Sequence, residues 1–183
     1  MPIEYEMSER NRLFVVCGPP GTGKTTVARE VAEESGGELI RTDVVRTDLF
    51  SNPTYTDEEV QATYEAVFDR ARSVLGSDGV AVLDGTFRHA ELRERAKRLS
   101  REFGARFEIV RVECATEVLK RRIEARTDDE SDAEFVHHLS IESEFDPLTE
   151  RHHRIDNSGT VAETKAQLAT LFEVADVPAD GSV

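Results

Sequence analysis

Hydrophobic residues along this chain fall into two kinds of pattern. Short continuous runs rich in β-branched residues predict buried strands, and apolar residues spaced three or four apart predict amphipathic helices. The predicted strands span residues 12–18, 37–42, 79–85, 105–114 and, with a weaker signal, 151–156. The predicted helices span residues 24–35, 56–75, 89–104, 116–126, 131–145 and 160–175.

Capping residues agree with several of these boundaries. Gly36 and Gly37 follow the first predicted helix, and glycine is typical of a helix C-terminus. Thr56 or Asp57 is expected to cap the second helix at its N-terminus, and Thr116 is expected to cap the fourth.

Strands that alternate with helices indicate βαβ units. They predict an α/β fold with a parallel sheet of about five strands and helices on both faces. Ligands of such sheets bind outside the carboxyl ends of the strands. We expect one domain over residues 1–183, with a core from about 12 to 174 and loose ends at 1–11 and 175–183.

The composition narrows the class of protein. No run of about 18 apolar residues occurs, and the start "MPIEYEMSERNR" lacks a stretch of signal-peptide length, so we expect a cytoplasmic protein. Cys17 and Cys114 lie in apolar runs and are interpreted as buried small hydrophobic residues. The pairs His137–His138 and His152–His153 lack metal-ligand spacing and are interpreted as ordinary.

The net charge of −14 is large for 183 residues. Such a surface repels polyanions at low ionic strength, and it suits a very salty cytoplasm, where about 1 M salt screens charges beyond roughly 3 Å. The charge is uneven, because residues 88–126 hold twelve Lys and Arg against seven Asp and Glu, which leaves −14 − 5 = −19 elsewhere. Solvated basic helix faces and a phosphate-binding site both explain this local excess.

The strongest motif is "GPPGTGKT", Gly18 to Thr25, which matches GxxxxGK(S/T) between a predicted strand and a predicted helix. In this motif, glycines let backbone N–H groups converge on the phosphates of a nucleoside triphosphate. Lys24 is expected to reach the β- and γ-phosphates, and Thr25 to offer its hydroxyl group to Mg²⁺. The motif predicts a nucleoside triphosphate and Mg²⁺ as cofactors; we expect ATP, although the motif leaves both the choice between ATP and GTP and the fate of the γ-phosphate open.

The third strand ends in "VLDG", and Asp84 is the second expected metal ligand. Gly85 follows it, where an ATPase motor of the AAA type usually has a glutamate that polarises water. The chain is also too short to include the helical lid domain of such a motor. Both observations argue against a motor.

Two further segments carry candidate catalytic charges. "VLKRRIEAR" places Arg122 and Arg126 four apart on one helix face, where they are expected to stabilise the phosphoryl group in transfer unless they form an ordinary basic face. "RTDVVR" places Asp43 three residues before Arg46 after the second strand. The spacing alone does not distinguish a catalytic carboxylate from an ion pair on a helix surface, whereas Asp48 is interpreted as a solvated acid.

Together these motifs resemble the P-loop kinases related to the bacteriophage polynucleotide 5′-hydroxyl kinase, zeta toxins and gluconate kinases, and above all the "AAA domain" ATP-binding proteins of that group. The resemblance runs from about Leu13 to Leu171. It rests on "GPPGTGKT", "RTDVVR", "VLDGTF", "VLKRRIEAR", "SDA" at 131–133 and "IDNSGT" near the end. It implies an adenylate-kinase-like P-loop fold with a helical lid.

The resemblance also implies roles for single residues. Asp43 would accept the proton of the attacking hydroxyl group, Arg46 would lie in the acceptor pocket, and we assign Thr86 and Arg88 to the same pocket. The "IDNSGT" turn would contact the adenine base. The predicted nucleotide-binding residues are therefore Gly18, Pro19, Pro20, Gly21, Thr22, Gly23, Lys24, Thr25, Thr26, Asp156, Asn157 and Ser158.

We therefore predict an ATP-dependent kinase with a hydroxyl acceptor. The chain has no Trp and only 7% aromatic residues, which favours a small-molecule acceptor over a polynucleotide 5′ end, because it offers few platforms for base stacking. Two competing hypotheses are an ATPase or nucleotide-dependent switch without an acceptor, and a nucleotide-binding module without catalysis. The oligomeric state is not predicted.

Overall fold

A computed structural model describes residues 11–125 and 131–173. Its centre is a parallel sheet of five strands in the order β2-β3-β1-β4-β5. The strands are β1 Arg12–Cys17, β2 Glu38–Arg41, β3 Val80–Asp84, β4 Arg106–Glu113 and β5 His153–Asp156. The predicted α/β class and strand number are confirmed.

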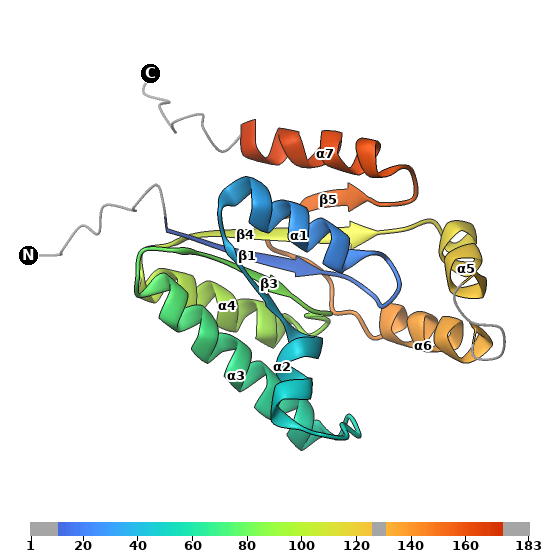
Figure 1. Cartoon of the computed structure of the whole chain (residues 1–183), viewed down its shortest axis with the longest axis horizontal. Helices are drawn as coiled ribbons and strands as arrows, with labels where there is room; N and C mark the ends of the chain where they lie inside the picture. Colours follow the sequence, from blue (N-terminus) through green and yellow to red (C-terminus); the bar gives the residue numbers. More distant parts are fainter. Residues whose placement is uncertain (1–10, 126–130, 174–183) are drawn as a thin grey trace, which may run out of the picture.

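Seven helices connect the strands in the described part of the chain. They are α1 Lys24–Ser35, α2 Thr42–Leu49, α3 Asp57–Leu75, α4 Ala90–Glu102, α5 Thr116–Glu124, α6 Ser131–Ser143 and α7 Val161–Glu173. Figure 1 shows α1 and α7 on one face of the sheet and α3 and α4 on the other, with α5 and α6 beyond the strand carboxyl ends.

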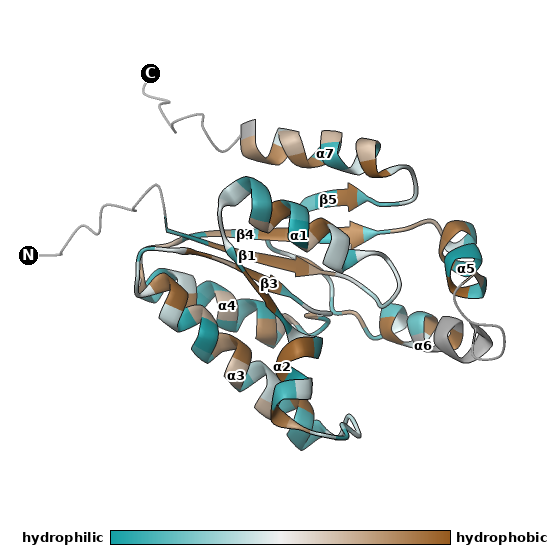
Figure 2. Cartoon of the chain, viewed as in Figure 1, coloured by the Kyte–Doolittle hydropathy of each residue, from teal (hydrophilic) through white to brown (hydrophobic). Residues whose placement is uncertain are grey.

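Each face of the sheet carries its own apolar core. Phe14 and Val16 of β1 point to the α1 and α7 side, while Leu13 and Val15 point to the α3 and α4 side. This alternation follows from the two-residue period of a strand. In Figure 2 the central strands are largely hydrophobic, while polar residues colour much of the helix surfaces.

Two predicted helix caps differ in outcome. Thr56 caps α3, because its side chain accepts a hydrogen bond from the Glu59 N–H group. The predicted cap Thr116 is wrong: it is the first residue of α5, and Ala115 occupies the cap position without a side-chain bond. The hydrophobic pattern also did not delimit α2, a helix of eight residues that starts directly after β2.

The two cysteines differ in environment. Cys17 is fully buried, as predicted, and burial raises the pKa of its thiol to about 11, so the thiol stays protonated at neutral pH. Cys114 is only half-buried. No helix in the described ranges is long and apolar enough to cross a membrane.

Candidate active site

The loop from Gly18 to Gly23 joins β1 to α1 and starts at the centre of the sheet. Its three glycines have positive φ angles, which residues with a side chain rarely adopt. A Cβ atom on Gly18 would lie 2.4 Å from the carbonyl oxygen of Val112, and one on Gly23 would lie 2.1 Å from Nδ2 of Asn157. The strand β1 lies between β3 and β4, so the strands on its two sides are reached by connections that run in opposite directions along the sheet. Ligands of parallel α/β sheets usually bind at such a point, beyond the carboxyl ends of the strands.

Lys24 begins α1 and folds back over the loop. Its Nζ donates a hydrogen bond of 2.7 Å to the Pro19 carbonyl oxygen. Burial lowers the pKa of the ammonium group, and the carboxylates of Asp84 and Asp43 oppose that shift. A half-buried cation with one carbonyl partner is well suited to receive the phosphate oxygens of a nucleotide.

Asp84 and Thr25 meet beside Lys24. The Thr25 hydroxyl group donates to Oδ2 of Asp84 at 2.7 Å, and the Asp84 side chain is only 3% exposed. Burial raises the pKa of this carboxyl group, although the Thr25 bond and the charges of Lys24 and Arg41 partly offset the effect.

These two residues fit a magnesium ion. Both supply hard oxygen atoms, and Mg²⁺ in nucleotide sites typically takes one or two protein oxygens together with phosphate oxygens and waters. Within the described ranges no group of three or more His, Cys, Asp or Glu side chains forms a metal site. A metal at Thr25 and Asp84 therefore depends on the phosphates of the nucleotide.

Asp43 lies in the first turn of α2, at the carboxyl end of β2. Its side chain is 67% exposed and accepts a hydrogen bond of 2.8 Å from Nη2 of Arg41. Arg41 is the register partner of Asp84 across the β2–β3 pair, which brings Asp43 toward the Asp84 carboxylate. Asp48 lies elsewhere, paired with Arg70 at 2.8 Å.

One cavity of about 610 Å³ joins these groups. Of the predicted site residues, it brings together Pro20, Gly21, Gly23, Lys24, Thr25, Thr26, Asp43, Arg46, Asp84, Thr86 and Arg88. Its remaining lining residues are Thr42, Tyr55, Val60, Tyr64, Gly85, His89, Leu92 and Ile141. The nucleotide side and the predicted acceptor side therefore open onto the same space.

Of the two predicted lid arginines, Arg122 is described by the structure and is not brought into this cavity. Helix α5 packs on the P-loop through Leu119, whose Cδ1 would meet a Cβ on Gly21 at 2.7 Å. Arg122 does not line the cavity, and its Nη1 contacts Sγ of Cys114 at 3.6 Å. Arg126 lies outside the described residues. Their role at the phosphates stays a prediction.

The turn 156–158 supports the P-loop from behind. Asn157 is buried, its Nδ2 donates to the Thr22 carbonyl oxygen at 2.8 Å, and its Oδ1 accepts from the Thr164 hydroxyl group at 2.8 Å. Asp156 and Ser158 bond to each other, and Ser158 also binds the backbone of Ala115 at 2.7 Å. None of the three lines the cavity. The contact with adenine stays a prediction, whereas support of the loop is a role that sequence reasoning missed.

Five of the twelve Lys and Arg in residues 88–126 form ion pairs within the described part of the chain. Arg95 pairs with Glu65, Arg106 with Glu108, and Arg111 with Glu142 at 3.3 Å. Of the arginines and lysines in the described part of this segment, only Arg88 lines the cavity. The phosphate-site explanation of the local charge therefore holds for a single arginine.

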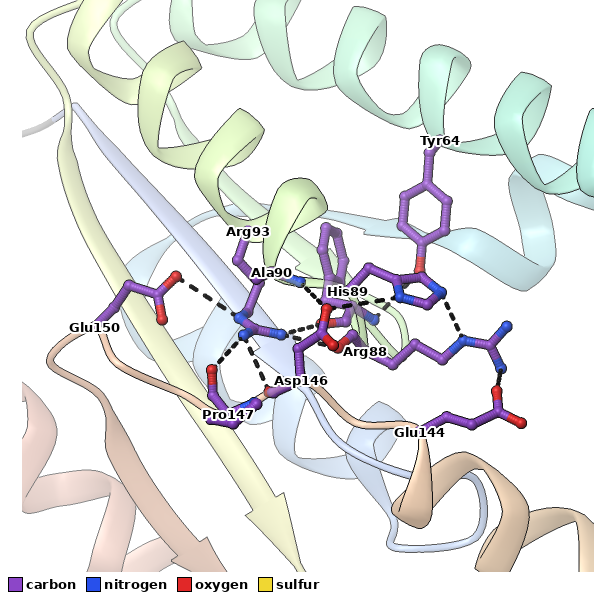
Figure 3. Close-up of polar contacts among 10 residues, drawn as sticks. Tyr64, Arg88, His89, Ala90, Arg93, Glu144, Asp146, Pro147 and Glu150 are labelled. Atoms are coloured by element: carbon purple, nitrogen blue, oxygen red, sulfur yellow. Dashed lines mark hydrogen bonds and ion pairs between the residues drawn. The ribbon is translucent and has the colours of Figure 1, made fainter.

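The wall around Arg88 is built by a fully buried arginine that the motifs did not reveal. Nη1 of Arg93 donates to the carbonyl oxygens of Phe87 and Arg88 at 2.9 and 3.1 Å. Nη2 donates to those of Asp146 and Pro147 at 3.1 and 2.9 Å, as Figure 3 shows. This side chain joins the loop after β3 to the segment after α6.

Helix α6 also reaches the P-loop. His138 is buried, and its Nδ1 donates to the Pro20 carbonyl oxygen at 2.7 Å, a supporting contact that sequence reasoning missed. No local signal marks it, because its partner lies 118 positions away in the sequence.

Comparison with protein families matches residues 13–148 to the family described as AAA domain. The chain belongs to this family. An uncharacterized protein of Mycobacterium tuberculosis, Rv2004c, is 36% identical over 134 residues, which cover 67% of this AAA domain chain and 27% of that protein. A tRNA dimethylallyltransferase of Koribacter versatilis is 32% identical over 130 residues, covering 50% of this chain and 42% of that protein. The chain thus spans about a quarter of the length of the first of these relatives.

Solved P-loop kinases share the fold of this AAA domain. The APS kinase CysC of Mycobacterium tuberculosis, in complex with AMPPNP and APS, has a TM-score of 0.69 at 18% identity and covers 90% of this chain and 98% of its own. A gluconokinase of Sinorhizobium meliloti has a TM-score of 0.65 at 22% identity and covers 90% and 94%. The resemblance inferred from the motifs is confirmed at the level of family and fold.

Proposed function

We propose that this protein is an ATP-dependent kinase that transfers the γ-phosphoryl group to a hydroxyl group of a small molecule. The observation that carries the proposal is the position of Asp43. It opens onto the same cavity as Lys24, Thr25 and Asp84, so a hydroxyl group bound beside it would face the end of a bound triphosphate.

The residues divide the work of an in-line transfer. ATP with Mg²⁺ supplies the phosphoryl group and neutralises charge on it when bound. Lys24 binds the β- and γ-phosphates, and Thr25 and Asp84 hold the metal. Asp43 accepts the proton of the acceptor hydroxyl as its oxygen bonds to phosphorus and the bond to the β-phosphate oxygen breaks. Arg122 and Arg126 would have to approach from the lid to stabilise the transferring charge.

Two features support a small acceptor. The cavity has about 610 Å³ to hold both the terminal phosphates and the acceptor, which suits a compact molecule. The net charge of −14 disfavours a polynucleotide at low salt. The solved proteins of similar fold include a sugar kinase, a gluconokinase and the APS kinase.

The test is a transfer assay with γ-labelled ATP on the wild type, Asp43→Asn and Asp48→Asn. Asp48 is the matched control, an exposed acid of the same helix outside the cavity. The acceptor panel contains sugars, nucleosides and 5′-hydroxyl oligonucleotides, at low and molar salt. We expect Asp43→Asn to lower the acceptor-dependent rate by ~10²–10⁴-fold with little change in ATP affinity, and Asp48→Asn to keep both.

Each remaining outcome of the assay points to a different function. Transfer to the oligonucleotide alone would replace the small acceptor by a polynucleotide end. ATP hydrolysis that no acceptor accelerates would indicate an ATPase or switch, although Gly85 stands where a motor would use a glutamate. Loss of ATP binding in Asp43→Asn without loss of acceptor turnover would assign Asp43 to the nucleotide.

A further inference from the structure

Two guanidinium groups lie at the acceptor side of the cavity. Arg46 extends from α2, and Arg88 from the loop after β3. Both are half-buried. The half-buried Lys24 and the buried Asp84 belong to the proposed nucleotide and metal side of the cavity, and Asp43 is already paired with Arg41.

Arg46 lacks a carboxylate partner at ion-pair distance among residues 11–125 and 131–173. Its Nε contacts the Thr63 hydroxyl group at 3.5 Å, a long distance, and its guanidinium carbon lies 4.4 Å from the centre of the Tyr55 ring. Stacking on an aromatic ring fixes the plane of a guanidinium group and leaves its edge free for a planar or tetrahedral anion. The Glu59 carboxylate interacts electrostatically with Arg46 but is hydrogen-bonded to Thr54 and Tyr55, so the cation is oriented without a direct ion pair.

Arg88 is held by weak partners. Its Nη1 lies 3.1 Å from Oε2 of Glu144, a pair in which the side chains are 31% and 51% exposed, and its Nε donates to Nε2 of His89 at 3.0 Å. Exposed ion pairs contribute little, so an oxyanion that enters the cavity can displace Glu144 at small cost.

The backbone beneath Arg88 is fixed more firmly than its side chain. The buried Arg93 binds the Phe87 and Arg88 carbonyl oxygens, and the Tyr64 hydroxyl group accepts from the Phe87 N–H at 3.3 Å. Phe87 has a φ of 45°, a conformation that a phenylalanine rarely adopts. Figure 3 shows this frame around Arg88 and His89. A strained, buried turn therefore presents this arginine to the cavity.

We propose that the acceptor carries an oxyanion in addition to its hydroxyl group, and that Arg46 and Arg88 bind this oxyanion. The proposal rests on the proposed kinase function, because only a kinase has a phosphoryl acceptor. The anion site itself is a property of the cavity and does not depend on that function. Phosphate, sulfate and carboxylate share the chemistry, since each accepts paired hydrogen bonds from guanidinium groups. A neutral sugar or nucleoside would leave Arg46 without an anion at ion-pair distance and Arg88 with only its exposed pair to Glu144.

The binding test uses the full chain saturated with Mg²⁺ and AMPPNP, so that the P-loop is filled. Sodium sulfate, sodium phosphate and sodium acetate are titrated separately at constant ionic strength, and binding is followed by calorimetry and by NMR shifts of the arginine side chains. We expect saturable binding of at least one anion, weakened roughly 10- to 100-fold by Arg46→Ala and by Arg88→Ala. Arg70→Ala, which removes an exposed arginine of α3 paired with Asp48, is the matched control and should bind as the wild type does.

Arg88→Lys separates charge from structure, because it keeps the cation and loses the guanidinium fork. Partial recovery of anion binding in this variant supports the site, provided that all variants unfold at the wild-type temperature. Absence of saturable binding by the wild type, or equal binding by Arg88→Ala, would overturn the proposal. So would a fall in AMPPNP affinity in Arg88→Ala that matches the fall in anion binding, since Arg88 would then serve the nucleotide.

The failure of this proposal is distinguishable from failure of the kinase function. Anion binding at these arginines without any phosphoryl transfer would leave the site standing and remove the function. Transfer that is equally efficient to a sugar and to its phosphorylated counterpart, and equally affected by Arg88→Ala for both, would leave the kinase standing and remove the oxyanion.

Discussion

At the scale of single residues, the candidate site holds ionisable side chains at positions where burial disfavours their charged forms. Lys24 is half-buried with a lowered pKa, and Asp84 is buried with a raised pKa. Each is held in place by one short hydrogen bond, to the Pro19 carbonyl oxygen and from the Thr25 hydroxyl group. Such groups gain most from the phosphates and metal that complete their coordination.

Lys24→Ala is expected to abolish turnover nearly completely while the protein stays folded. The ammonium group is the charge nearest the predicted β- and γ-phosphates, and loss of a preorganised donor of this kind costs at least ~10²-fold in rate. Lys165→Ala is the control, because Lys165 is exposed on α7 and pairs with Glu30 at 2.9 Å. Steady-state rates and thermal unfolding are measured for both variants; unchanged turnover in Lys24→Ala would rule out the phosphate-binding assignment.

Asp84→Asn is expected to stabilise the nucleotide-free protein at pH 7 and to weaken Mg²⁺-dependent nucleotide binding. The folded-state pKa of Asp84 is raised above 3.8 because burial penalises the carboxylate. The stability linked to its proton is therefore fully present below pH 3.8 and is lost as the pH rises through the folded pKa. The stability advantage of the asparagine variant should accordingly shrink as the pH falls toward 3.8.

Thermal unfolding of both proteins over that pH range checks this expectation, with nucleotide titrations at fixed Mg²⁺ as the second readout. An asparagine variant that is less stable than the wild type at pH 7 would show that the Thr25 and Arg41 contacts outweigh the cost of burial. Unaltered Mg²⁺ dependence would remove Asp84 from the metal site.

At the scale of elements, the P-loop is held by parts of the chain far from it in sequence. The start of α5 packs on Gly21, His138 of α6 binds the Pro20 carbonyl oxygen, and Asn157 after β5 binds that of Thr22. The conformation of the loop therefore depends on contacts with α5, α6 and the turn after β5 as well as on its glycines.

Asn157→Ala is expected to lower the free energy of unfolding by about 1–3 kcal/mol, because it leaves the Thr22 carbonyl oxygen without its buried donor. If the residue only supports the loop, ATP and GTP affinities should fall by the same factor. Thr170→Ala, an exposed substitution on the neighbouring helix α7, is the control. Urea unfolding and titrations with both nucleotides decide the point, and a selective loss of ATP affinity would restore the predicted contact with adenine.

At the scale of the whole molecule, negative charge dominates. The net charge is −14, and the exposed ion pairs of the described residues each contribute little, about 0–1 kcal/mol. We therefore expect self-repulsion of like charges to outweigh the sum of attractive surface pairs at low salt. The arginine-lined acceptor side of the cavity is an exception within this acidic surface.

Raising KCl from 0.1 M to 1 M is expected to raise the unfolding temperature by roughly 3 °C or more, since the Debye length falls from about 10 Å to about 3 Å over this range. Calorimetric scans in KCl and in NaCl should agree, and sucrose at matched osmolality separates screening from hydration effects. An unfolding temperature that falls with salt would mean that the surface ion pairs dominate instead.

Local patterns in the chain were enough to specify most of the elements and the phosphate loop. Strand and helix signals are local, because a run of β-branched residues or a spacing of three and four extends over about ten residues. The same holds for "GPPGTGKT", in which the glycine conformations and the position of Lys24 follow from neighbours along the chain. The strands, the long helices and the existence of the phosphate loop were therefore predictable.

The acceptor half of the site depended on the packing of the sheet. Asp43 reaches the cavity because β2 lies beside β3 and sets Arg41 against Asp84, a choice of strand order that no local pattern encodes. The local excess of positive charge was compatible with a phosphate-binding site. In the structure, however, carboxylates of this chain pair with Arg95, Arg106 and Arg111. Arg93 donates to the carbonyl oxygens of Asp146 and Pro147, which lie 53 and 54 positions away in the sequence. The physical reason is common to all of these: partners distant in sequence become neighbours only when the order of strands is fixed, and the free energy of that order belongs to the packed sheet as a whole.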